Sequence, residues 1–150
     1  DMQTYTRPFR KEVYDKVDAP SKKALVKYLE SEGHTIVNTE ECYYADVVSE
    51  KDGVMYFNEA ERKAQWDGEW PNHWAEVRIP GRKRRLVQKY KDKIENLYFY
   101  VFNNGYDQAW KVKGTQMTDE ALKEAFGTRI PDGETFYHIP YKEAELINVT

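Results

Sequence analysis

The stretch Val54–Gln65, VMYFNEAERKAQ, changes chemistry halfway along a strand-like run, because it begins apolar and aromatic and ends in charge. Read with the two-residue period of a strand, it has two faces, one with Glu59, Glu61, Lys63 and Gln65 and the other with Ala60, Arg62 and Ala64. A strand in a sheet half-buries its inward face, where unpaired charges are costly. A divalent metal held by the carboxylates would remove that cost; the alternative is an exposed edge strand with cross-strand ion pairs.

The segment before this stretch places a further carboxylate nearby. Glu41–Ser49, ECYYADVVS, predicts a strand with Asp46 at its centre, and residues 50–53 (EKDG) are typical of a hairpin turn. Asp46 and Glu61 are therefore expected on adjacent antiparallel strands.

Helices and strands around this hairpin follow in a recognisable order. A helix is predicted over Pro20–Gly33 and a strand over His34–Asn38. After the hairpin, a second helix is predicted over Pro80–Glu95, and strands over Leu97–Phe102 and Gln108–Lys113. Between the hairpin and this second helix, residues 66–77 suggest a loop or flap. Its Trp66, Trp70 and Trp74 either pack a small core or stack on unpaired bases.

Asp46, a hairpin and then Glu61-Arg62-Lys63 resemble the motif of the PD-(D/E)xK nuclease superfamily, with Ala45 in place of the motif's proline. The superfamily includes restriction-endonuclease-like and archaeal Holliday-junction-resolvase-like enzymes, and the resemblance covers residues 20–113. It implies an α/β fold with a mixed β-sheet flanked by helices and an α-β-β-β-α-β core. We expect one domain over residues 1–150, with residues 1–19 as an arm and 114–150 as a C-terminal addition that includes a short helix, Asp119–Phe126, and a strand, Thr135–Ile139.

The resemblance also implies roles for individual residues. Asp46 and Glu61 would be ligands of Mg²⁺, for which Mn²⁺ can substitute, and Lys63 would contact the attacking water or the scissile phosphate. Glu59 is either a ligand of a second metal ion or a solvated residue, and Gln65 either orients water, contacts DNA or has no functional role. The first helix has Ser21-Lys22-Lys23 where many relatives have a metal-binding glutamate, which would leave a simpler metal site.

Positive charge is concentrated in one part of the chain. The whole sequence has a formal charge of −3, whereas residues 78–93 contain eight basic residues and one acid, or +7, which leaves −10 for the remainder. This distribution predicts a local phosphate-binding surface, although a solvated helix face is the ordinary explanation of such a run. The residues expected to contact nucleic acid are Arg82, Lys83, Arg84, Arg85, Gln88 and Lys89.

The predicted function is a metal-dependent DNA endonuclease that hydrolyses phosphodiester bonds, of a phage-type or repair and recombination class that includes junction resolution. A homodimer is expected if the enzyme cuts two strands. The alternative is a non-catalytic module that binds nucleic acid or protein and keeps the nuclease fold. The sequence has one cysteine, Cys42, and neither a membrane-length apolar run nor a signal-peptide pattern, so a cytoplasmic location is expected, in the host cell if a phage encodes the protein.

Overall fold

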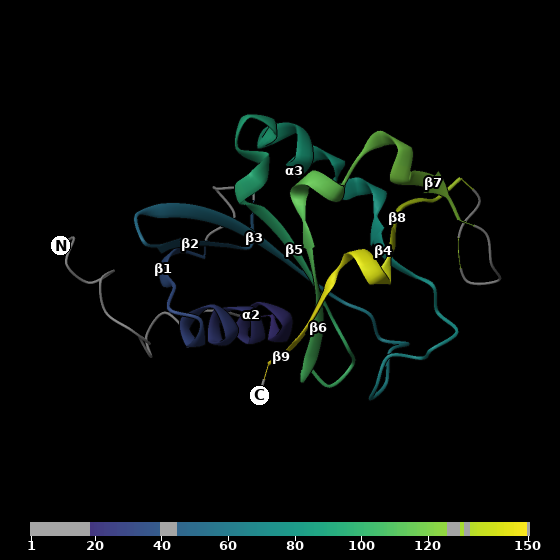
Figure 1. Cartoon of the computed structure of the whole chain (residues 1–150), viewed down its shortest axis with the longest axis horizontal. Coiled ribbons are helices and arrows are strands. Elements are labelled where there is room, and N and C mark those ends of the chain that lie inside the picture. The colour runs from purple at the N-terminus through teal and green to yellow at the C-terminus, as the bar shows by residue number, and fades with distance from the viewer. Residues whose placement is uncertain (1–18, 40–44, 126–129, 131–132, 150) are drawn as a thin grey trace.

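The computed structural model describes residues 19–39, 45–125, 130 and 133–149. It is a mixed α/β structure with a six-stranded sheet in the order β1-β2-β3-β5-β6-β9 and a three-stranded sheet in the order β4-β8-β7 (Figure 1). The strands of the large sheet are β1 (Thr35–Asn38), β2 (Val47–Lys51), β3 (Val54–Arg62), β5 (Leu97–Phe102), β6 (Gln108–Lys113) and β9 (Glu145–Asn148). The strands of the small sheet are β4 (Glu76–Pro80), β7 (Leu122–Glu124) and β8 (Thr135–Pro140).

The helices are short apart from the first. They are α2 (Pro20–Ser31) and α3 (Arg84–Lys89), together with the 3₁₀ turns η3 (Gly81–Lys83), η4 (Lys91–Asn96), η5 (Gly114–Gln116), η6 (Asp119–Ala121) and η7 (Tyr141–Glu143). Pro20 lies in the first turn of α2, where its missing N–H costs no hydrogen bond. Gly33, with a φ of 88°, turns the chain out of this helix into β1. The first helix and first strand therefore lie where the sequence predicts them.

Helix α2 covers one face of the large sheet (Figure 1). Leu25, Val26 and Leu29 are fully buried on its inner side. They belong to one hydrophobic cluster with sheet residues that include Ile36, Val47, Ala60, Tyr100, Phe102 and Ile147. The stripe of apolar residues in the helix thus fixes which face of each strand points toward it.

The β2–β3 hairpin sets the register of the strands that carry the acidic residues. Its two-residue turn has a positive φ at both Asp52 (53°) and Gly53 (79°), the geometry that matches the twist of paired strands. The turn pairs Val47 with Asn58, so that Asp46 comes opposite Glu59. Strand β3 also runs parallel to β5, and the connection between them contains β4, η3, α3 and η4.

The second face of the large sheet shares one core with the small sheet. Trp66 is fully buried there and packs on Trp70 and Trp110, with ring centroids 5.0 and 6.3 Å apart. Val77 and Ile79 of β4 belong to the same cluster. The core-packing alternative is thereby confirmed for Trp66.

Several predicted boundaries are wrong. The helix expected over Pro80–Glu95 is broken, because Pro80 ends β4 and the non-helical backbone at Lys93 interrupts the last turn. The helix expected over Asp119–Phe126 is a single 3₁₀ turn followed by β7, although Thr118 caps it as its position suggests. Strands β4, β7 and β9 were not predicted. Cys42, residues 41–44 of the expected second strand and residues 1–18 of the arm lie outside the described residues.

Within the described ranges, no helix is both long and apolar enough to cross a lipid bilayer.

Candidate functional site

Asp46 and Glu59 form the inner part of an acidic cluster on the second face of the sheet. The backbone N–H of Asp46 donates to Oε1 of Glu59 over 2.9 Å, and the backbone N–H of Ala60 donates to Oδ2 of Asp46 over 2.9 Å. The two side chains are therefore locked across the β2–β3 ladder. As the sequence predicts, the antiparallel hairpin brings Asp46 and Glu61 close together; the residue directly opposite Asp46 is Glu59, and Glu61 lies two residues further along the same face.

A buried lysine from the connection between β3 and β5 offsets part of the charge of this cluster. The 3₁₀ turn η3 directs Lys83 inward, and its Nζ lies 2.5 Å from Oε2 of Glu59 and 3.6 Å from Oε2 of Glu61. Lys83 is 6% exposed, so its ammonium is largely removed from water. Arg82 from the same turn donates to Oε1 of Glu61 over 3.2 Å at the surface. The carboxylates of Glu59 and Glu61 thus both face cations from η3.

Burial and charge oppose each other at Glu59. The pKa of its carboxyl is raised to about 7. Burial and then the nearby carboxylate of Asp46 raise this pKa, while the ammonium of Lys83 and the N–H of Asp46 lower it. The carboxyl therefore keeps a charge near neutral pH only with the help of its two hydrogen-bond donors.

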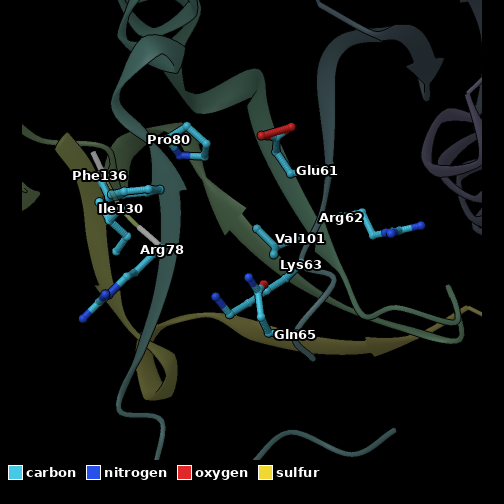
Figure 2. Close-up of a pocket in the computed structure, with 9 residues that line it drawn as sticks. All are labelled: Glu61, Arg62, Lys63, Gln65, Arg78, Pro80, Val101, Ile130 and Phe136. Carbon is cyan, nitrogen blue, oxygen red and sulfur yellow. The ribbon is translucent and has the colours of Figure 1, made fainter. Parts of the chain in front are cut away.

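Lys63 and Gln65 follow β3 and lie apart from the Asp46–Glu59 pair. The backbone N–H of Lys63 donates to the carbonyl of Phe102, and its Nζ lies 5.2 Å from the ring centroid of Trp74. Both residues line a pocket with Arg78 of β4, and Figure 2 shows Lys63 extended toward the side of Arg78, with Glu61 at the other end of the pocket. Burial, and then the charge of Arg78, lower the pKa of Lys63.

The basic run of residues 82–89 is mostly exposed. Arg82, Arg84, Arg85, Gln88 and Lys89 lie at the surface, and Arg84 lies 3.7 Å from the carboxylate of Asp119. Lys83, which the sequence placed among the residues that contact nucleic acid, is instead buried against Glu59 and Glu61. A role for the other five in binding nucleic acid stays a prediction.

The carboxylates of the acidic cluster are engaged by protein groups in this arrangement. The described part of the chain contains no group of three or more His, Cys, Asp or Glu side chains placed to hold a metal ion. Asp46 accepts a backbone N–H, and Glu59 and Glu61 face Lys83. An ammonium thus supplies the positive charge that the sequence led us to expect from a metal.

Sequence reasoning missed Lys83 and Arg78 as parts of this region. Lys83 is hidden in a run of four basic residues, and its inward direction depends on the 3₁₀ turn that precedes α3. Arg78 lies in an alternating pattern, with Val77 and Ile79 buried on either side of it, and this alternation could have revealed β4.

Compared with known proteins, the chain matches no protein-family model and no curated protein.

Proposed function

We propose that this protein is a DNA endonuclease that hydrolyses phosphodiester bonds. The observation that carries the proposal is the placement of Asp46, Glu59 and Glu61 on one face of a β-hairpin, beside a pocket that contains Lys63 and Arg78. Apart from β4, which belongs to the small sheet, the order of α2, β1, β2, β3, α3 and β5 also agrees with the α-β-β-β-α-β core of the superfamily that the sequence resembles. A restriction-endonuclease-like fold is part of this proposal.

In this proposal the acidic and the basic residues of the site have different chemical roles. Glu61 borders the pocket and is 23% exposed, so its carboxylate can accept a proton from a water that enters there. Lys63 and Arg78 can neutralise the phosphate on which that water acts. Asp46 and Lys83 would hold Glu59, and through it the end of β3, in a fixed position.

The test is a cleavage assay with labelled duplex, nicked, flapped, four-way and single-stranded DNA, each with Mg²⁺, Mn²⁺ or EDTA. We expect one member of the panel to be cut by the wild type and by Lys27→Met, an exposed lysine on α2, but not by Asp46→Ala or Lys63→Ala. Mg²⁺, with Mn²⁺ as its substitute, stays a prediction that the EDTA arm tests. Cleavage that persists undiminished in both variants would refute the assignment.

The burial of Lys83 favours a second candidate, a non-catalytic module that binds nucleic acid. The ammonium of Lys83 against Glu59 and Glu61 opposes the charge of the carboxylates that an enzyme would use. This candidate predicts DNA binding that weakens steeply with salt and no turnover with any metal. Metal-dependent cutting that Asp46→Ala abolishes would exclude it.

Cleavage of both strands of a duplex would require two active sites, and we propose a homodimer for that case. Light scattering in the presence and absence of the cleaved DNA measures the number of copies. A single copy on a substrate that is cut in both strands would contradict the dimer.

A further inference from the structure

The pocket beside Glu61 is built from both sheets and is unlike the acidic cluster next to it. Its volume is about 280 Å³. Its lining includes the polar side chains of Glu61, Lys63, Gln65 and Arg78 and the apolar side chains of Ile130 and Phe136. Figure 2 shows Ile130 and Phe136 beside Arg78, at the side away from Glu61. A ligand of this pocket therefore meets positive charge and an apolar surface together.

The positive charge in the pocket is poorly neutralised by the protein. Among the described residues, no carboxylate pairs with Lys63, although the side chain is partly buried and repelled by Arg78. Arg78 has Glu76 at 3.9 Å, a long contact between side chains that are 41% and 35% exposed. Two partly desolvated cations side by side are unfavourable without an anion, so an anionic ligand group would stabilise them.

The position of that anion is restricted by Glu61. A phosphate near the carboxylate end of the pocket would be repelled, whereas one between Lys63 and Arg78 would be neutralised. Gln65 adds an amide that can donate to or accept from the same ligand. If the ligand also carries an apolar group, a phosphate between Lys63 and Arg78 would let that group reach Phe136 and Ile130.

We infer that this pocket binds one unpaired nucleotide of a DNA strand, with its phosphate on Lys63 and Arg78 and its base or sugar against Phe136. The inference rests on the proposed function and specifies its substrate class. A volume of about 280 Å³ lies at the lower end for small-ligand sites, so there is room for a single nucleotide and not for a base pair.

The size of the pocket therefore selects among DNA structures. A base inside a duplex is paired and stacked, and extruding it costs a few kcal/mol, whereas a strand end, a flap or a mismatched nucleotide is already free. The preferred substrate is thus DNA with an unpaired nucleotide beside the bond that is cut. Uninterrupted duplex would bind through the exposed basic residues of α3 without filling the pocket.

The first experiment measures binding of a deoxynucleoside monophosphate to the intact protein by NMR chemical-shift titration in EDTA. We expect Arg78→Met and Lys63→Met each to weaken binding at least about tenfold, and Lys27→Met to leave it unchanged. Inorganic phosphate should bind more weakly than the nucleotide because it leaves the apolar wall empty. Wild-type affinity in both pocket variants, or equal affinity for phosphate and nucleotide, would overturn the inference.

The second experiment separates this inference from the proposed function. In EDTA, a duplex with a single-stranded overhang should displace the nucleotide from the pocket, and a blunt, fully paired duplex of the same length should not. If the protein cuts DNA but the two oligonucleotides compete equally, the pocket inference fails and the nuclease survives. If the nucleotide binds as expected but no DNA is cut with any metal, the nuclease fails while the nucleotide site stands.

Discussion

The buried ion pair between Lys83 and Glu59 gives the sharpest test of the geometry. The Lys83→Met substitution keeps the volume of the side chain but leaves the Glu59 carboxylate without its ammonium at a site where only 4% of the side chain is exposed. Breaking one partner of a buried pair costs about 3–5 kcal/mol. The remaining hydrogen bond from Asp46 favours the lower end of that range, so we expect a loss of about 3 kcal/mol, or about 10 °C in Tm, for a domain of this size.

The assay is a double-mutant cycle at pH 8 by urea unfolding with Lys83→Met, Glu59→Gln and the double variant. The double variant removes both charges, so its loss should be smaller than the sum of the single losses by at least about 1.5 kcal/mol. Lys27→Met is the matched control, because it removes an exposed lysine and should change stability by less than about 0.5 kcal/mol. Single losses that add within about 0.5 kcal/mol would refute the contact between Lys83 and Glu59.

Two further predictions concern stability. Burial, and then the charges of Lys51 and Lys111, lower the pKa of His34 to about 4. As pH falls below 6.5, the ordinary pKa of histidine, the unfolded chain therefore binds a proton at His34 before the folded protein does. Acidification from pH 7 to 4 should thus cost the wild type about 1–2 kcal/mol more than His34→Gln in unfolding titrations, allowing for the ring's partial exposure; equal losses would contradict this. In Gly81→Ala the new Cβ would lie 2.9 Å from the carbonyl oxygen of Thr135, which costs about 1–3 kcal/mol, whereas Gly105→Ala meets nothing within 4 Å and should be neutral by thermal unfolding.

Local patterns predicted the central strands because their signals do not depend on distant residues. The apolar run Leu97–Phe102 coincides with β5, and the alternation of Gln108–Lys113 coincides with β6. Strand β9 has no comparable signal, because Glu145 and Leu146 are exposed at the sheet edge and only Ile147 is buried in it. Its place beside β6 depends on tertiary contacts.

The broken helix after β4 shows a different limit of sequence reasoning. Residues 80–95 have a helical spacing of apolar residues, and Leu86 is buried as that spacing predicts. Pro80 nevertheless pairs with Phe136 in the small sheet, and the next residue, Gly81, packs closely against Thr135. Pairing with a strand more than fifty residues away thus overrides the local preference for helix.

The composition of the acidic face was predictable, whereas its pairings were not. Alternation along β3 places Glu59, Glu61 and Lys63 on one face, and the structure agrees up to the end of the strand at Arg62. Which of the two glutamates lies directly opposite Asp46 depends on the register of the hairpin, and the turn at Asp52-Gly53 places Glu59 there, with Glu61 two residues further along.

The charges on this face divide the region into two parts of opposite sign. Asp46, Glu59 and Glu61 supply three carboxylates and η3 supplies two cations, Arg82 and Lys83, which leaves a net charge of −1 when every group is ionised. On the other side of Glu61, Lys63 and Arg78 give the pocket a positive end. A phosphate would therefore be attracted to the positive end of the pocket and repelled by the acidic cluster. It would then lie between the two, where the carboxylate of Glu61 faces it. That polarity is what a hydrolytic site needs and what a uniformly basic binding surface lacks, and it is why the nuclease ranks above the binding module despite the burial of Lys83.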